Sequence, residues 1–358
     1  MSGVYISYPF CRQKCSFCNF ASDVASDPVK TRYGAALLEE IRAHEWQWSP
    51  ETVYFGGGTP SLMPPELVAE IMRALPAKCL REATIECAPG TLNRSLLESW
   101  TVAGINRVSL GVQSFVAEEL KTSGRRHSAE DVEREVDLLR ASGIENINLD
   151  LIAGLPEQTA ASWERSLDWI EHIRPPHVSV YLFEVDEESR LGREFLLGGS
   201  RYGAARMPSE DLAAQFYERA VERLEAVSYT RYEISNFARA GHESLHNLKY
   251  WKLEPYVGFG LDAHSYDGCE RWQNPDSLIE YLSRAPQIRS RTDRGEEHFF
   301  VGLRMMSGIE PTQEEWTRFA RPIERWTRAG LLERTGSRLR LTADAVLVSN
   351  EILAEFVA

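Results

Sequence analysis

The chain has 358 residues, 43% of them hydrophobic, which is enough for a large core in about two domains. Its net charge of −13 argues against a nucleic-acid partner, because nucleic-acid-binding proteins more often present a basic face. We see no run of about eighteen apolar residues and no basic-then-apolar leader at the N-terminus, so we expect a cytoplasmic protein without a membrane span.

Short apolar runs and amphipathic stretches alternate along the first half of the chain. The runs predict strands, and the stretches that follow them predict helices. The expected strands are residues 3–7, 52–55, 83–87, 106–111, 146–152 and 177–183, and the expected helices are residues 29–45, 64–75, 93–103, 128–142, 158–173 and 209–227. This order is typical of parallel βαβ units and predicts an α/β fold, an incomplete (β/α) barrel of the TIM type.

The pattern changes in the last third of the chain. Residues 229–268 are rich in Gly, Tyr, His and Asn and lack clean periodicity, so we expect ordered loops over the mouth of the barrel. Helices are expected at 276–284, 294–306, 312–319, 322–330 and 343–356, with a hairpin of 331–334 and 338–341 around Gly336. We therefore predict a core barrel over 1–230, a loop-rich segment over 231–275, and a small winged-helix-like helical domain over 276–358.

Three of the six cysteines, Cys11, Cys15 and Cys18, lie in one loop directly after the first expected strand. Thiolates are soft ligands that suit iron–sulfur clusters. A [4Fe–4S] cubane held by three thiolates keeps one iron open for the amino and carboxylate groups of S-adenosylmethionine. Zinc is the competing metal, but structural zinc sites usually have a fourth ligand, which this loop lacks. Three core cysteines are the remaining alternative, and the polar residues between them argue against it.

The other cysteines are scattered. We interpret Cys79 and Cys269 as small core residues, and we leave Cys87 open.

Polar and glycine residues recur where the expected strands end. Gly56–Thr59 follow the second strand, Glu86 ends the third, Gln113 follows the fourth, and Asp150 lies in the fifth. The carboxyl ends of strands carry the chemistry in (β/α) barrels, so we expect these residues to share one site. Taken singly, Glu86, Gln113 and Asp150 are also compatible with polar strand ends bonded to backbone or solvent.

The segment from Tyr5 to Cys18 resembles the radical S-adenosylmethionine superfamily. The residues 55–61, 106–115, 124–127 and 148–156 are similar to further segments of that family and occur in the family's order. Within it, the match is to the group of oxygen-independent coproporphyrinogen III oxidase and the heme chaperone HemW. The resemblance implies a [4Fe–4S] cluster on the three cysteines and S-adenosylmethionine on the open iron.

The resemblance also implies which residues hold the cofactor. By it, the cluster-bound cofactor would be contacted by Tyr5, Phe17, Gly57 and Glu86. A second cofactor site, known from the oxidase, corresponds to Gly58, Thr59, Gln113, Arg125, Asp150 and Glu184. An arginine suits a carboxylate because it can bind it with two hydrogen bonds. Glu184 is the weakest member, since its acidic neighbours favour a solvated loop.

Three features favour the chaperone over the oxidase. Phe20 stands where the oxidase has a fourth cysteine, and only four residues precede Tyr5, where the oxidase has a long segment. Residues 246–251 match the H-N-x-x-Y-W motif of the chaperone group. Ser7 also replaces a histidine that is usual in the family, which weakens the oxidase interpretation further. We therefore predict a chaperone that binds heme and passes it to an acceptor haemoprotein, with an electron donor to the cluster.

The alternatives to a chaperone are oxidative decarboxylation of coproporphyrinogen III and a radical enzyme with an unrelated substrate. The resemblance also suggests a homodimer.

The motif at 246–251 offers groups that suit heme. His246 can bind heme iron, and Tyr250 and Trp251 beside Asn247 can pack on the porphyrin. The alternative is a histidine hydrogen-bonded within the protein, with the two aromatic residues in the core. His242 and His264 are further candidates for the iron ligand.

Overall fold

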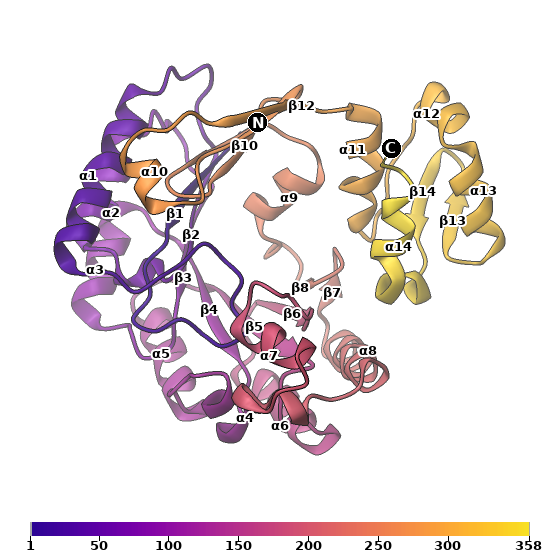
Figure 1. The fold of residues 1–358 in the computed structure, drawn as a ribbon, viewed down its shortest axis with the longest axis horizontal. Coiled ribbons are helices and arrows are strands. Elements are labelled where there is room, and N and C mark those ends of the chain that lie inside the picture. The colour runs from indigo at the N-terminus through magenta and orange to yellow at the C-terminus, as the bar shows by residue number, and fades with distance from the viewer. Residues whose placement is uncertain (1, 358) are drawn as a thin grey trace.

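The computed structural model describes residues 2–357 as a curved sheet, helices along one face of it, and a small C-terminal unit (Figure 1). Seven neighbouring strands of the sheet are parallel. In spatial order they are β9 (Tyr256–Phe259), β1 (Gly3–Tyr8), β2 (Thr52–Gly57), β3 (Glu82–Cys87), β4 (Arg107–Gln113), β5 (Asn146–Ala153) and β6 (His177–Leu182). The carboxyl ends of all seven therefore meet along one edge.

Short antiparallel strands extend the sheet on both sides to twelve strands. Beyond β6 lie β8 (Asn236–Ala238) and β7 (Thr230–Arg231), and beyond β9 lie β10 (His264–Tyr266), β11 (Glu270–Gln273) and β12 (Ile288–Arg291). The strands β12 and β7 are the two edges of this sheet, so the barrel is an incomplete one. The predicted fold class is confirmed.

The helices that connect the parallel strands cover the outer face of the sheet (Figure 1). They are α1 (Asp27–Ala43), α2 (Pro65–Ala74), α3 (Arg94–Ala103), α5 (Ala129–Ala141) and α6 (Ala160–Ile173), and α8 (Glu210–Ala226) follows the last parallel strand. Two shorter helices, α4 (Ala117–Thr122) and α7 (Arg190–Leu196), follow β4 and β6. Each predicted strand and helix of this half matches within two residues. Local signals explain the agreement: α5, for example, begins at a capping box in which Ser128 and Asp131 bond each other's backbone N–H groups.

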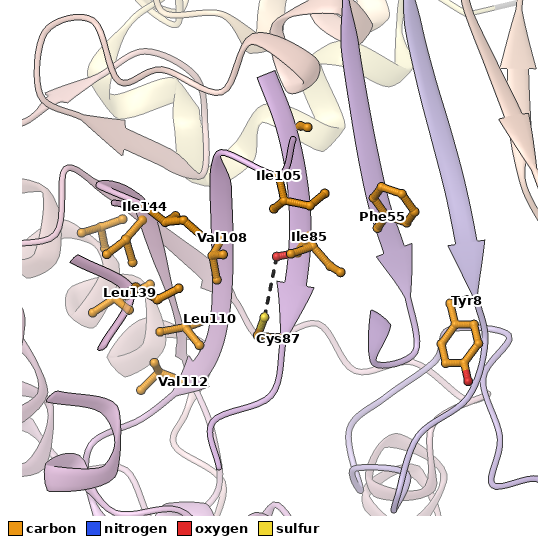
Figure 2. Packing of buried hydrophobic residues seen from close by; sticks show 14 of the residues in the cluster. Tyr8, Phe55, Ile85, Cys87, Ile105, Val108, Leu110, Val112, Leu139 and Ile144 are labelled. Carbon is orange, nitrogen blue, oxygen red and sulfur yellow. Dashed lines mark hydrogen bonds between the residues drawn. The ribbon is translucent and has the colours of Figure 1, made fainter. Parts of the chain in front are cut away.

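Each strand alternates between two kinds of side chain. Val4 and Ile6 of β1, and Val53 and Phe55 of β2, are fully buried against the helices. Figure 2 shows the same layer further along, where Ile85 and Cys87 lie near Val108 and Leu110 of the next strand. Burial of such side chains stabilises the fold by roughly 1.5–3 kcal/mol each. The opposite face of the sheet is polar and carries the candidate site.

Two cysteine predictions were wrong. Cys79 and Cys269 are exposed, whereas Cys87 is buried. Cys79 lies in the turn between α2 and β3, and Cys269 follows Gly268, which has a φ of 104°, in the turn between β10 and β11. Both cysteines stand at surface positions of these turns, where the thiol stays in contact with solvent.

The C-terminal unit has a hydrophobic core of its own, built around Phe299, Phe319 and Phe356. Its elements are α11 (Arg294–Phe300), α12 (Gln313–Arg318), α13 (Ala320–Arg328), the hairpin of β13 (Leu332–Thr335) and β14 (Arg338–Leu341), and α14 (Ser349–Ala354). The predicted helices and hairpin are present. The strand β12 was missed because all four of its residues are exposed, so no alternation marks it.

Residues 231–275 differ from the expectation of loops over the barrel mouth. They contain β9, which joins the parallel sheet, and the helix α9 (Leu245–Trp251). Glu82, the first residue of β3, accepts hydrogen bonds from the backbone N–H groups of Leu245 and His246, both at 2.9 Å. The helix is therefore docked at the amino ends of the strands, opposite the edge that carries the cysteines. The helix α10 (Leu278–Leu282) follows.

Every helix among the described residues is too short or too polar to cross a lipid bilayer.

Candidate functional site

The inner face of the sheet carries polar side chains on neighbouring strands, and they bond across the strands. Tyr54 Oη donates to Glu86 Oε1 at 2.9 Å. On the next strands, Ser109 Oγ donates to Asp150 Oδ2 at 3.3 Å and Asn148 Nδ2 donates to Asp150 Oδ1 at 2.7 Å. The predicted carboxylates Glu86 and Asp150 are thus brought to one face, where both remain partly open to solvent.

The cysteine loop follows β1 at the carboxyl edge of the sheet. The backbone N–H of Cys11 donates to the carbonyl of Asp23 at 3.0 Å, which folds the loop back on itself. Ser16 bonds two distant segments through its backbone: its N–H donates to the carbonyl of Ser123, and its carbonyl accepts from the N–H of Leu191. The loop is therefore held from both sides, while the three cysteines stay partly exposed.

The Cys11 thiol lies close enough to the other two thiols to be influenced by them. Burial raises the pKa of the Cys11 thiol, and neighbouring Cys18 and Cys15 raise it further, while a hydrogen bond from Thr59 Oγ1 at 3.3 Å lowers it. Ser22 Oγ lies 3.6 Å from Cys18 Sγ. A cluster with one thiolate on each of three irons suits this spread of soft donors on one partly exposed loop.

Within residues 2–357, no three His, Cys, Asp or Glu side chains converge on one point as a single metal ion would require.

The glycine loop after β2 packs directly on the cysteine strand. Gly58 N–H donates to the carbonyl of Tyr8 at 2.8 Å, and Thr59 N–H donates to the carbonyl of Phe10 at 3.1 Å. A Cβ on Gly58 would lie 2.7 Å from the carbonyl carbon of Pro9, and Gly57 has a φ of 109°. Gly57 and Gly58 are thus required by the close approach of these two chain segments, a structural reason besides room for a cofactor.

Burial tunes both carboxylates of the inner face. It raises the pKa of Glu86 to about 7, and the nearby Asp150 raises it further, against the hydrogen bonds from Tyr54 and the Gly57 backbone. Burial also raises the pKa of Asp150. Pairs of perturbed carboxylates in one site are typical of functional centres.

A second group of predicted residues gathers beyond β4. Arg125 Nη1 donates to the carbonyl of Gly111 at 2.5 Å, and the guanidinium lies 6.0 Å from the centre of the Phe17 ring. Gln113 Nε2 lies 3.0 Å from the position that a Cβ on Gly111 would take. Gln113 has a φ of 71°, a strained value for a residue other than glycine, and such strain is concentrated at functional sites. The structure brings Phe17, Gln113 and Arg125 together.

Glu184 does not join these groups. Its side chain is exposed and accepts a hydrogen bond from Asn350 Nδ2 of α14 at 3.4 Å. It therefore links the loop after β6 to the C-terminal unit in this structure.

His246 is enclosed within the protein. It is fully buried, and its Nδ1 and Nε2 share hydrogen bonds with Thr52 Oγ1 at 2.8 Å and with Tyr250 Oη at 2.7 Å. Burial lowers its pKa to about 3, so the ring is neutral near pH 7. In this arrangement neither ring nitrogen is free for heme iron.

The other residues named with His246 are more open. Asn247, Tyr250 and Trp251 are partly buried on α9 and the guanidinium of Arg304 lies 5.3 Å from the centre of the Trp251 ring. His242 is partly buried, and His264 is exposed at the start of β10.

Sequence reasoning missed several residues of the inner face. Tyr54 and Thr52 are two and four positions before Gly56 on the same strand, so strand alternation places all three on one face. Tyr181 of β6 exposes 41% of its surface although burial raises its pKa well above the usual value. Solvent therefore reaches the inner face near the carboxyl end of β6. Strand alternation could have identified Thr52, Tyr54 and Tyr181 as residues of the inner face.

Comparison with known proteins shows clear relatives. The radical SAM superfamily matches residues 5–170. The heme chaperone HemW of Bacillus subtilis is 32% identical and the alignment covers 100% of this chain and 99% of that protein. The heme chaperone HemW of Synechocystis is 36% identical over 86% of this chain and 79% of that protein.

Among solved structures, coproporphyrinogen III oxidase (HemN) from Escherichia coli, a radical SAM enzyme, superposes with a TM-score of 0.83. The match covers 99% of this chain and 89% of that chain at 21% sequence identity. At this identity the likeness shows a shared fold.

Proposed function

This chain belongs to the radical SAM superfamily and, within it, to the family of the heme chaperone HemW, and on that premise we propose that it binds heme and delivers it to an acceptor haemoprotein. The observation that carries the proposal is the similarity itself, at 30–36% identity to HemW proteins of several bacteria over most of the chain. Heme is the cargo in this proposal, and the cluster and S-adenosylmethionine are resident cofactors.

The residues of the carboxyl edge have the chemistry that the resident cofactors need. Cys11, Cys15 and Cys18 would hold the [4Fe–4S] cluster, which supplies one-electron redox chemistry when bound. Next to this loop, the superfamily resemblance assigns Tyr5, Phe17, Gly57 and Glu86 to S-adenosylmethionine. The ionised Glu86 carboxylate suits a ribose hydroxyl or an ammonium group. With only three thiolates, one of the four irons would have no protein ligand and could bind S-adenosylmethionine.

A second S-adenosylmethionine position is part of the proposal. Its residues would be Gly58, Thr59, Gln113, Arg125 and Asp150, while Glu184 would have to leave its contact with Asn350 to take part. The close grouping of Phe17, Gln113 and Arg125 supports an anion-binding corner at this point, because a guanidinium can bind a carboxylate with two hydrogen bonds.

The partners complete the proposal. They are an acceptor haemoprotein, an electron donor to the cluster, and a second copy of the chain in a homodimer. The net charge of −13 supports a protein without a nucleic-acid partner. The proposed location is the cytoplasm.

Oxidation of coproporphyrinogen III is the second candidate function, and the shared fold with the oxidase favours testing it. Phe20 stands at the position of a fourth cysteine of the oxidase motif, and it is 65% exposed. A phenylalanine has no group that could bind iron there, which favours the chaperone. A turnover assay with coproporphyrinogen III therefore has to distinguish the oxidase function from the chaperone function.

One anaerobic experiment decides between the two functions. The cluster-reconstituted protein is given S-adenosylmethionine, an electron donor and coproporphyrinogen III, and a parallel sample is titrated with heme and then mixed with an apo-haemoprotein. We expect a Soret band on heme binding, transfer of heme to the acceptor, and no decarboxylation. Conversion of coproporphyrinogen III over multiple turnovers, without heme transfer, would contradict the chaperone proposal.

A further inference from the structure

The imidazole of His246 is fixed by contacts on both nitrogens. Thr52 of β2 shares the hydrogen bond at Nδ1, and Tyr250, one turn later on α9, shares the one at Nε2. The backbone packs just as closely, since a Cβ on Gly3 would lie 3.1 Å from His246 Cε1. The ring is thus held against the amino ends of β1 and β2.

This ring also supports a residue of the candidate cofactor site. The rings of His246 and Tyr54 are stacked, with centres 5.2 Å apart and planes inclined by 29°. Tyr54 in turn donates its hydroxyl proton to Glu86 at 2.9 Å, and it stacks on Tyr5 with ring centres 6.2 Å apart. A continuous series of contacts therefore runs from α9 to two residues assigned to S-adenosylmethionine, Glu86 and Tyr5.

We propose that His246 is a positioning residue of the S-adenosylmethionine site: its ring holds Tyr54 in the position from which Tyr54 bonds to Glu86. The inference rests on the proposed function, because it takes Glu86 as a cofactor contact. In this proposal the histidine of the H-N-x-x-Y-W motif holds Tyr54 in place inside the barrel and does not bind heme iron.

The helix α9 is anchored firmly enough to hold His246 in one position. Glu82 accepts hydrogen bonds from the first two N–H groups of the helix and lies 4.0 Å from Arg107 Nε, and both side chains of that ion pair are buried. Lys249, on the same helix, bonds Glu51 at 3.2 Å and Glu254 at 3.0 Å. The helix is therefore tied to the sheet on several sides, and His246 cannot shift without breaking these contacts.

Binding of heme iron by His246 would disturb the contacts of its ring. The ring would have to give up the bond to Thr52 or to Tyr250 and turn away from Tyr54, so heme binding there would release Tyr54 from its position beside Glu86. If His246 were the ligand, heme and S-adenosylmethionine would compete. If it is the positioning residue, they bind independently.

A double-mutant cycle tests the role of His246 directly. The dissociation constant of S-adenosylmethionine is measured by calorimetry on anaerobic, cluster-reconstituted wild type, His246→Ala, Tyr54→Phe and the double variant, and each is also titrated with heme. We expect about tenfold weaker S-adenosylmethionine binding for either single change, as loss of a hydrogen bond to a carboxylate implies. The double variant should bind no more weakly than Tyr54→Phe alone, because His246 acts through Tyr54.

The controls separate a local effect from misfolding. His172→Ala removes an exposed histidine of α6 that pairs with Glu133 and should change neither affinity. If His246→Ala does not fold, Thr52→Val removes the partner of Nδ1 at constant size and should weaken S-adenosylmethionine binding about threefold.

The outcomes are distinct. Additive effects in the cycle, or loss of heme binding with unchanged S-adenosylmethionine affinity, would overturn the inference. Absence of heme binding by the wild type would instead contradict the proposed function, and the cycle would still decide the role of His246.

Discussion

Replacement of Glu82 by alanine should destabilise the protein strongly. The carboxylate is the acceptor for the N–H groups of Leu245 and His246, and it is the partner of the buried Arg107 guanidinium. Glu82 is 2% exposed and Arg107 is 1% exposed, so water cannot easily replace the lost carboxylate. The change leaves two backbone donors and one charge without a partner.

The magnitude follows from these three groups. An unsatisfied buried donor costs about 1–3 kcal/mol, and removal of one partner of a buried ion pair costs about 3–5 kcal/mol. The two costs overlap because the same carboxylate serves both, so we expect a loss of about 4 kcal/mol in the free energy of unfolding. Glu82→Gln keeps one carbonyl acceptor for the helix and loses the charge, so it should cost about half as much.

Urea unfolding followed by circular dichroism measures both variants against the wild type. Glu98→Ala serves as the matched control, since this glutamate is exposed on α3, and the change should stay within about 0.5 kcal/mol. A loss below about 1 kcal/mol for Glu82→Ala would refute the reasoning. It would mean that α9 is held by its packing and that Arg107 finds another partner.

Three more predictions address the site and the pH dependence. Cys15→Ala should abolish the absorbance of the reconstituted cluster and its paramagnetic signal after reduction, whereas Cys79→Ser, an exposed cysteine outside the loop, should keep both; a full cluster in Cys15→Ala would exclude this thiol as a ligand. The affinity for S-adenosylmethionine should fall as the pH drops below about 7, where Glu86 takes up a proton, and Glu86→Gln should remove that dependence, measured by calorimetry between pH 6 and 8. Burial raises the pKa of Glu233 to about 7, so the folded state binds a proton there more tightly than the unfolded chain does. The unfolding free energy should therefore decline as the pH rises from about 4.5 to about 7, by roughly 1–3 kcal/mol, and Glu233→Gln should flatten the curve; an unchanged slope in urea titrations would contradict this assignment.

The parallel half of the fold could be predicted because its signals are local. Each of its strands is a short apolar run, and several of its helices begin at a side-chain cap, as the capping boxes at Ser128 and Thr159 show. The position of the cysteine loop could be predicted for the same reason, because its three cysteines lie within eight residues directly after a strand. The expectation that Glu86 and Asp150 share one site needed only the rule that polar residues near the carboxyl ends of parallel strands gather at one edge.

The environment of His246 could not be predicted, because it depends on distant pairs. Its partner Thr52 is 194 positions earlier in the chain, and its helix is anchored by Glu82, which is 164 positions earlier. The pattern of the motif shows a histidine and two aromatic residues, which suit a ligand site and a packed interior equally well. The pairing of β9 with β1 was missed for the same reason, since strand partners at such separations leave no local signal.

The strand that leads into the cysteines has an unusual position in the order of synthesis. β1 is made first, yet one of its two neighbours, β9, comes from residues 256–259, and the loop itself is held by backbone bonds to residues 123 and 191. A ribosome must therefore release most of the polypeptide before β1 has both neighbours. Contacts between such distant segments also form slowly in folding. The loop that carries the three thiols therefore gains its final surroundings only after residues 256–259 have been made, late in the synthesis of a chain of 358 residues.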